Sequence, residues 1–219
     1  MAKPLDTAVL VIGLGRFGTA LAEELVASGH DVMAIERDRN IVQHFADDFT
    51  SVVQADATDP DALSQLGVEE FDTAVVGIGT SIESSVLTVA NLVDLGVTNI
   101  WAKAMTRAHG QVLDRIGANH VIYPEQEAGE RTAHLLGGTM RNFTEFSPGY
   151  ALANITIPQT LAGRPVRELR LKDRYGVTVV AYEDTHDLHH VGPETQLPAG
   201  GNMLVAGPTD RVDEFAKRL

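Results

Sequence analysis

The feature that most constrains the fold is a glycine-rich turn between an apolar run and an amphipathic stretch. Residues 9–12 (Val-Leu-Val-Ile) form an unbroken apolar run, as expected of a strand buried on both faces of a parallel sheet. The turn Gly13-Leu14-Gly15-Arg16-Phe17-Gly18 follows directly and opens the amphipathic stretch 19–28. A second strand is predicted at residues 30–35 and ends in Glu36. This order of elements predicts a unit that binds a nucleotide.

Each glycine of the turn has a separate mechanical role in this interpretation. Gly13 lets the chain turn sharply, Gly15 lets a pyrophosphate approach bare backbone, and Gly18 lets the helix pack closely on the strand. The phosphates then lie at the helix N-terminus, where unpaired N–H groups and the helix dipole favour anions. Glu36 can accept hydrogen bonds from ribose hydroxyls, and its charge would repel a 2′-phosphate.

Composition excludes several classes of protein. The chain has 219 residues, 44% of them hydrophobic, which is enough for a sizeable core. A net charge of −13 argues against a nucleic-acid partner, and the lack of cysteine excludes disulfides and thiolate chemistry. Residues 1–6 lead almost directly into the first strand, and no apolar stretch approaches the ~20 residues that span a bilayer. We therefore expect a cytoplasmic protein that reaches a membrane only through a partner.

Strand and helix signals alternate through the first two-thirds of the chain. Further strands are predicted at residues 50–55, 72–76, 99–104 and 120–123. Helices are predicted at 59–66, 81–95, 106–116 and 128–140. This alternation predicts an α/β fold, a Rossmann-like doubly wound parallel sheet of six strands.

The pattern changes after Phe143. Strands are predicted at 150–157, 177–182 and 203–206, with helices at 161–171 and 209–219. The sequence therefore predicts two domains, a nucleotide-binding domain at 1–144 and a small α+β domain at 145–219. The second is small for a core of its own, so we expect it to dimerise or dock.

In doubly wound sheets, ligands lie beyond the carboxyl ends of the strands. The residues there, besides the glycine turn, are Glu36, Arg37, Asp56, Ala57, Thr58, Gly77, Ile78, Gly79, Thr80, Lys103, Ala104, Met105 and Glu125. Asp56 could accept a hydrogen bond from the exocyclic amine of adenine, although its segment also suits a helix-capping turn. Lys103 could contact phosphate or be simply solvated, and Arg16 is better placed to offer bidentate donors.

Residues of other chemical classes carry weaker signals. Ser81, Ser84 and Ser85 lack the glycines of a nucleophile elbow and favour helix capping. His186, His189 and His190 could bind a metal, but a flexible loop of solvated histidines is the stronger hypothesis. No tyrosine precedes a lysine by four positions, and the second domain offers no obvious catalytic pair. A non-enzymatic protein is therefore expected; the alternative is an NAD-dependent oxidoreductase or sugar-nucleotide enzyme with an unrecognised catalytic centre.

Four motifs in register carry a resemblance to a known family. Residues 11–18, 55–59 (Ala-Asp-Ala-Thr-Asp), 101–104 (Trp-Ala-Lys-Ala) and 122–125 (Ile-Tyr-Pro-Glu) resemble the regulator-of-potassium-conductance (RCK) family. The whole chain is similar to the gating subunits of bacterial Ktr/Trk potassium uptake systems, with a nucleotide-binding domain followed by a TrkA-C type domain.

The resemblance implies a homodimer that assembles into an octameric ring beneath a membrane-embedded potassium-translocating subunit. ATP and ADP, or NAD(H), would compete for the cleft, and ATP would favour the open pore. By position, Arg16 would contact phosphates, Glu36 the ribose, and Asp56 and Ala57 the adenine. Residues 78–80, 103–105 and His109 would surround the cleft, and Glu125 would hold Mg²⁺ or Na⁺ between γ-phosphates of facing subunits. Many relatives have Asp where this chain has Glu36, which leaves the choice between ATP and NAD open.

The resemblance also implies that the C-terminal domain can bind cyclic di-AMP at its dimer interface. Arg170, Lys172 and Arg174 could meet its phosphates, and Tyr175 could stack on adenine. The alternative is an ordinary connection with a solvated basic face. A ligand sensor without a membrane partner is a third hypothesis for the whole chain.

Overall fold

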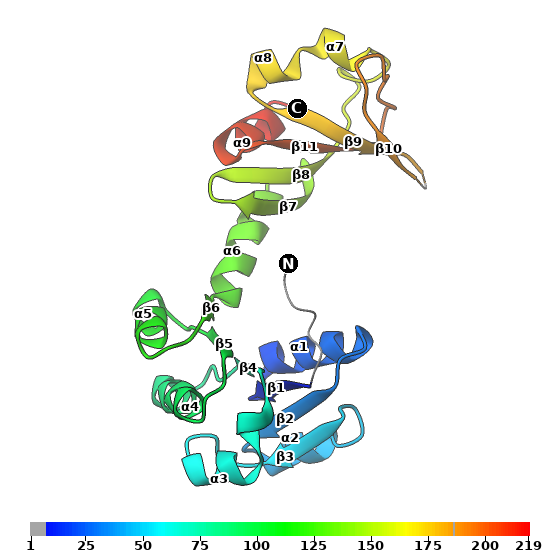
Figure 1. Cartoon of the computed structure of the whole chain (residues 1–219). Coiled ribbons are helices and arrows are strands. Elements are labelled where there is room, and N and C mark those ends of the chain that lie inside the picture. The colour runs from blue at the N-terminus through cyan, green and yellow to red at the C-terminus, as the bar shows by residue number, and fades with distance from the viewer. Residues whose placement is uncertain (1–7, 186) are drawn as a thin grey trace. The chain divides into compact units, whose positions relative to one another are not determined.

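The computed structural model describes residues 8–185 and 187–219. The chain divides into two compact units, Met1–Glu125 and Gln126–Leu219, which we describe separately (Figure 1). The expectations for residues 1–6 and for His186 lie outside the described residues.

The first unit is built on a six-stranded parallel sheet. Its strands are β1 (Val9–Ile12), β2 (Val32–Glu36), β3 (Ser51–Gln54), β4 (Thr73–Val76), β5 (Asn99–Lys103) and β6 (His120–Ile122). Their order is β3-β2-β1-β4-β5-β6, which confirms the Rossmann-like doubly wound prediction. The chain runs outward from β1 to one edge and then crosses to β4, so the crevice where ligands bind such folds lies between β1 and β4.

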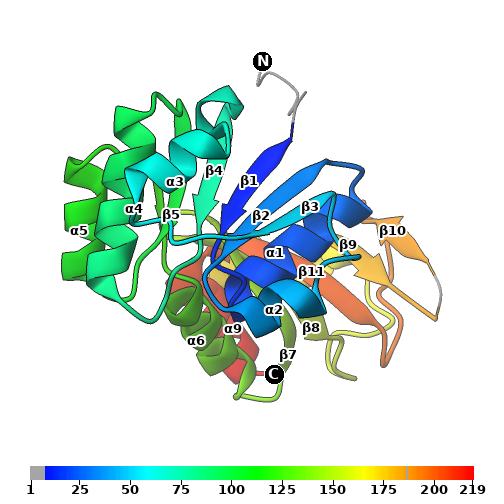
Figure 2. The ribbon, with the colours of Figure 1, turned by 90° about the horizontal axis from the view of Figure 1, so that it is seen from below.

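Helices cover both faces of this sheet (Figure 2). Helices α1 (Arg16–Ala27) and α2 (Arg39–His44) lie over a core that includes Val9, Val11 and Ala22. The other face carries α3 (Pro60–Gln65), the 3-10 turn η1 (Val68–Glu70), α4 (Ile82–Asp94) and α5 (Arg107–Arg115). Their core contains Leu10, Ile12, Leu63, Leu92 and Leu113. Apolar residues therefore face both ways from β1, as its unbroken apolar run predicts.

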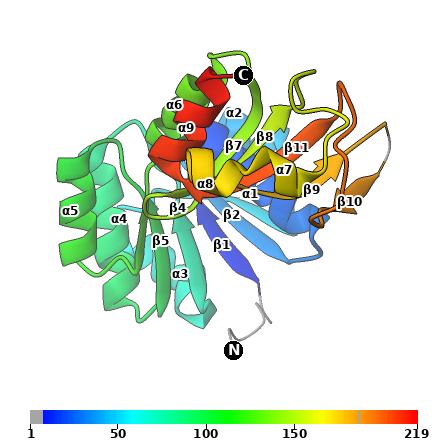
Figure 3. The ribbon, with the colours of Figure 1, turned by 90° about the horizontal axis from the view of Figure 1, so that it is seen from above.

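The second unit contains an antiparallel five-stranded sheet. After α6 (Pro124–Leu135) come β7 (Met140–Ser147), β8 (Tyr150–Thr156), α7 (Val166–Leu169), α8 (Leu171–Tyr175), β9 (Thr178–Glu183), β10 (Leu188–His190), β11 (Asn202–Pro208) and α9 (Thr209–Lys217). The strand order is β10-β9-β11-β8-β7. Helices α7, α8 and α9 cover one face (Figure 3), where Phe215, Leu169 and Val205 are buried. The predicted α+β domain is confirmed.

The boundary between the units falls earlier than the expected position after residue 144. Strand β7 pairs with β8 along most of its length, and Leu135 of α6 packs against the second core. The predicted helix 128–140 ends at Leu135, because Gly138 takes a left-handed φ of +77° and Met140 already belongs to β7.

Two further predictions in the second unit are wrong. The single helix expected at 161–171 is replaced by α7 and α8, with Arg170 between them at φ +48°. His189 and His190 belong to β10 rather than to a flexible loop. The His189 ring stacks on Tyr182 with centroids 4.8 Å apart, and its Nε2 lies 3.1 Å from a carboxylate oxygen of Asp184.

The described residues contain no group of three His, Cys, Asp or Glu side chains that could hold a metal. None of the helices in the described ranges is long and apolar enough to cross a membrane.

Candidate nucleotide site

A cavity of about 280 Å³ lies at the carboxyl ends of the central strands, where β1 and β4 diverge toward their helices. Its walls come from the segments that follow β1, β2, β3 and β4, and from the first turns of α4. It is lined by Ile12, Gly13, Gly15, Ile35, Glu36, Arg37, Ile41, Ala55, Asp56, Ala57, Thr58, Gly77, Ile78, Gly79, Thr80, Ser84 and Thr88.

The glycine turn forms one wall, and each glycine has a distinct geometry. Gly13 adopts φ +92°, a conformation that favours glycine. A Cβ atom on Gly18 would lie 1.9 Å from the Gly13 carbonyl oxygen, so only glycine allows this contact between α1 and β1. A Cβ on Gly15 would meet nothing within 4 Å, and Gly15 precedes the first residue of α1. Open space at a helix N-terminus suits an anionic group.

The carboxylate of Glu36 joins the end of β2 to this turn. Its Oε2 accepts a hydrogen bond from the Leu14 N–H at 2.8 Å, and its Oε1 accepts one from the Asp38 N–H at 2.9 Å. Each carboxylate oxygen has a second lone pair available, so the group can still accept from a ligand hydroxyl. Glu36 is thereby held in a fixed position on the cavity wall.

Asp56 is ordered by its own loop. Its Oδ1 accepts hydrogen bonds from the Thr58 Oγ1 at 2.7 Å and the Thr58 N–H at 3.0 Å. These two bonds lower the pKa of Asp56. The cap of α3 is Asp59, whose Oδ1 accepts from the Asp61 N–H at 3.0 Å. The segment is thus both a capping turn and part of the cavity wall.

Lys103 and Glu125 form an ion pair outside the residues that line the cavity. The Lys103 Nζ donates to Glu125 Oε1 at 2.6 Å, and Lys103 is nearly buried whereas Glu125 is exposed. This hydrogen bond is the largest of the effects that lower the pKa of Glu125, and the charge of Arg16 adds to it. The ammonium also lies 5.9 Å from the centre of the Phe17 ring.

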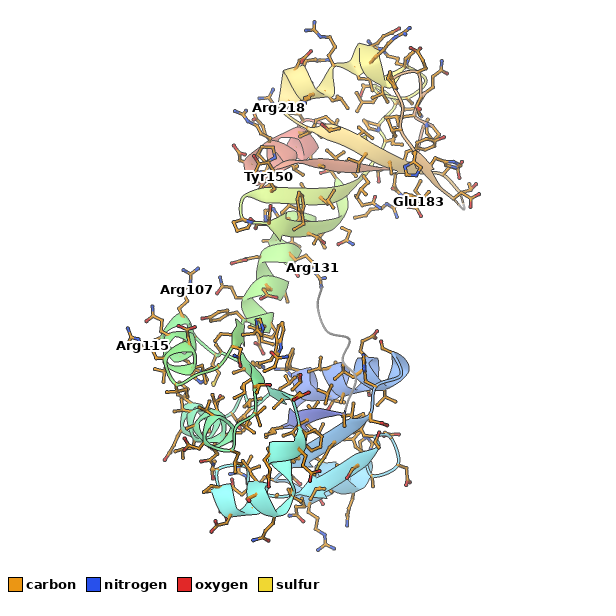
Figure 4. All side chains as sticks on the ribbon, in the orientation of Figure 1. Arg107, Arg115, Arg131, Tyr150, Glu183 and Arg218 are labelled. Atoms are coloured by element: carbon orange, nitrogen blue, oxygen red, sulfur yellow. The ribbon has the colours of Figure 1, made fainter. Side chains whose placement is uncertain are left out.

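His109 is a buried residue of α5. Arg107 and Arg115 of the same helix project outward (Figure 4). The His109 Nδ1 accepts a hydrogen bond from the Met105 N–H at 3.2 Å, so the proton of the neutral ring is on Nε2. That nitrogen is buried and has no partner among the described residues. Burial lowers the pKa of His109.

The expected site residues fall into two groups. Those that line the cavity are Gly13, Gly15, Glu36, Arg37, Asp56, Ala57, Thr58, Gly77, Ile78, Gly79 and Thr80. Those that do not are Arg16, Phe17, Gly18, Lys103, Ala104, Met105, His109 and Glu125. Arg16 instead lines an open groove between α1 and α2.

Sequence reasoning missed part of the lining. Ile35 and Ile41 are apolar and carry no chemical signal. Ser84 and Thr88 lie within helix α4, where the sequence favours capping for Ser84 and marks no role for Thr88. Helical periodicity places Ser84 and Thr88, three and seven residues after Ser81, on one face of α4, and this spacing is the signal that could have found them.

The segment expected to meet cyclic di-AMP makes contacts within its own unit. Arg170 donates from Nε to Asp173 at 3.1 Å. The Tyr175 ring packs on Phe215 with centroids 5.1 Å apart, and its hydroxyl accepts from Arg174 at 3.1 Å.

Family models match both units of the chain. The TrkA-N domain matches residues 9–124, and the TrkA-C domain matches residues 151–219. The chain belongs to the TrkA-N/TrkA-C family, also called RCK. The resemblance seen in the four sequence motifs is confirmed.

Relatives within this family share nearly the full length of the chain. It is 33% identical to the Ktr system potassium uptake protein C of Bacillus subtilis, over 95% of this chain and 96% of that protein. It is 30% identical to the Ktr system potassium uptake protein A of Vibrio alginolyticus, over 99% of this chain and 100% of that protein.

Solved structures share the fold at lower identity. The GsuK RCK domain has a TM-score of 0.65 at 19% identity, covering 99% of this chain and 48% of that one. The TrkA-N domain of the inner membrane protein YbaL from Escherichia coli has a TM-score of 0.53 at 24% identity, covering 59% of this chain and 96% of that one.

Proposed function

We propose that this chain is the nucleotide-binding regulatory subunit of a Ktr-type potassium uptake system. One observation carries the proposal: a cavity framed by a glycine turn and an acid lies at the β1–β4 crevice of a chain that aligns with Ktr potassium uptake proteins almost end to end. The ligand would be ATP or ADP, or NAD(H). Neighbouring folds solved with NAD and with ADP support the adenosine diphosphate part that these ligands share.

Different residues would bind different parts of the nucleotide. The turn at Gly15, with Arg16, would hold the phosphates, because open space and helix N–H groups are available there. Glu36 would bind the ribose, and Asp56 with Ala57 would lie at the base. Residues 78–80 would close the cavity from the β4 side, with residues 103–105 and His109 behind them.

Glu125 is suited to a cation between γ-phosphates, either Mg²⁺ or Na⁺. It is an exposed carboxylate whose lowered pKa keeps it charged at neutral pH. The Lys103 hydrogen bond engages Oε1, and no side chain among the described residues donates to Oε2. Such a cation would offset the repulsion between facing triphosphates.

The partner would be a membrane-embedded potassium-translocating subunit, and the chain would form homodimers that assemble into an octameric ring at the inner face of the membrane. Gating would be a population shift, in which ATP binds one ring shape better than ADP does. No reaction on the nucleotide is required. Cyclic di-AMP at the second unit is a further, separate regulator in this proposal.

The test combines binding, chemistry and size. Calorimetry should show that ATP and ADP bind the nucleotide-free protein, chromatography should show no turnover, and light scattering should give the mass of a large ring. Oxidation or reduction of a bound dinucleotide with a second substrate would contradict the proposal and favour the enzyme alternative. A protein that binds none of these ligands would contradict it outright.

A further inference from the structure

A buried hydroxyl with no partner among the described residues lies at the cavity wall on α4. Thr88 lines the cavity, and 0% of its surface is exposed. Its Oγ1 is shielded from solvent and makes no hydrogen bond within the described part of the chain. An unpaired buried hydroxyl opposes folding, whereas valine has nearly the same shape and would not. Such groups are rare in folded proteins and call for an explanation.

The position of Thr88 relative to the other walls indicates which part of a ligand it would meet. Asn91, three residues further along α4, donates from Nδ2 to the Ala57 carbonyl oxygen at 3.2 Å. Residues three apart on a helix are neighbours, so Thr88 lies beside the loop that contains Asp56 and Ala57. This end of the cavity is distinct from the phosphate end at Gly15.

The walls at this end suit a purine base. Ile35, Ala55 and Ala57 supply apolar surface for a flat ring. Asp56 offers Oδ2 as an acceptor for an exocyclic amine, because only its Oδ1 is engaged by Thr58. The Thr88 hydroxyl is a donor on this wall that can meet a ring nitrogen of the base.

We propose that the Thr88 hydroxyl donates a hydrogen bond to a ring nitrogen of adenine and makes the cavity selective for that base. The inference rests on the proposed nucleotide function. Threonine on a helix populates two χ1 rotamers, so rotation about one bond can turn the hydroxyl toward a ligand. The unpaired state of Oγ1 is then the ligand-free state of a group whose partner is the base.

The chain supplies a matched control. Ser85 lies on the same helix and is also fully buried, and its Oγ has no partner in the described ranges, but it does not line the cavity. Loss of the Ser85 hydroxyl removes the same kind of group without touching the ligand.

The experiment compares Thr88→Val, Thr88→Ser and Ser85→Ala in the full chain. Calorimetry would give the affinity for ADP and for its 1-deaza, 3-deaza and 7-deaza analogues, each of which replaces one ring nitrogen by C–H. Thr88→Val should weaken ADP binding about fivefold to twentyfold without lowering the melting temperature of the ligand-free protein. Thr88→Ser and Ser85→Ala should bind ADP nearly as the unmodified chain does.

The deaza analogues identify which ring nitrogen of adenine accepts the hydrogen bond from Thr88. One of them should bind the unmodified chain more weakly than ADP does, and Thr88→Val should weaken that analogue no further. An unchanged ADP affinity in Thr88→Val, or an equal loss for ADP and all three analogues, would overturn the inference. Either result leaves the proposed function intact, because the unmodified chain still binds an adenosine nucleotide in both cases.

Discussion

At the scale of single residues, the same substitution at two glycines of one turn should have different consequences. Gly18→Ala places a methyl group 1.9 Å from the Gly13 carbonyl oxygen, so α1 must shift on β1. We predict a loss of about 1–3 kcal/mol in the free energy of unfolding, or more, measured by denaturant titration. Gly15→Ala meets no neighbour within 4 Å and should leave that free energy nearly unchanged.

Substitutions at Gly15 should change ligand affinity rather than the stability of the fold. Gly15→Ala should weaken ADP, because its methyl group enters the space at the N-terminus of α1, and Gly15→Asp should abolish binding by adding charge there. Calorimetry on the folded variants is the measurement. A folded Gly15→Asp protein with unaltered ADP affinity would remove the glycine turn from the site.

Glu36 should act on every ligand that carries an adenosine ribose. Glu36→Ala removes the acceptor and the tie to Leu14, and we predict that ATP, ADP and NADH all weaken by about 1.5–3 kcal/mol. Glu36→Asp is one methylene shorter and should lose the bond to the Leu14 N–H. Equilibrium binding of all three ligands to both variants checks this, and a preference of the unmodified protein for NADPH would contradict the ribose role.

At the scale of elements, buried His109 of α5 should make the free energy of unfolding depend on pH. Burial lowers the pKa of His109, so the unfolded chain takes up a proton near pH 6.5 while the folded chain stays neutral. The unfolded state then binds more protons, and the free energy of unfolding should fall as pH decreases below about 6.5. His109→Gln keeps an acceptor for the Met105 N–H and should flatten this dependence. The exposed His44→Gln is the control; equal slopes in both variants would show that His109 is not responsible.

The elements also show why some of the fold could be predicted and some could not. The apolar runs of β1 and β4 and the capped helices α4 and α5 carry their own local signals, since Ser81 and Thr106 each accept a hydrogen bond at a helix start. Helix α2 has six residues, too few for a periodic pattern, and β7 alternates weakly because its residues are mostly polar. The strand β10 exists through its pairing with β9, which no local pattern encodes.

The residues of the candidate site also differ in whether a local sequence signal marks them. Gly13, Gly15 and Glu36 were predictable because turn chemistry and a fixed spacing mark them. Thr88 was not, because only the folded chain brings α4 beside the Ala57 loop.

At the scale of the whole molecule, Glu125 should separate nucleotide binding from gating. Glu125→Gln removes the charge that would hold a cation at a γ-phosphate, so ADP affinity should change little. ATP affinity should lose its dependence on added Mg²⁺ or Na⁺, as measured by calorimetry with and without each ion. If cation dependence is unchanged, Glu125 only balances Lys103, and its gating role would be withdrawn.

The central claim is that nucleotide state in this chain controls a potassium pore. The direct measurement is potassium flux through liposomes that contain a Ktr-type membrane subunit, with this chain added in its ATP-bound or ADP-bound form. The account predicts higher flux with ATP than with ADP, and no difference between the two nucleotides in Gly15→Asp. Equal flux with ATP, with ADP and without the chain would contradict it.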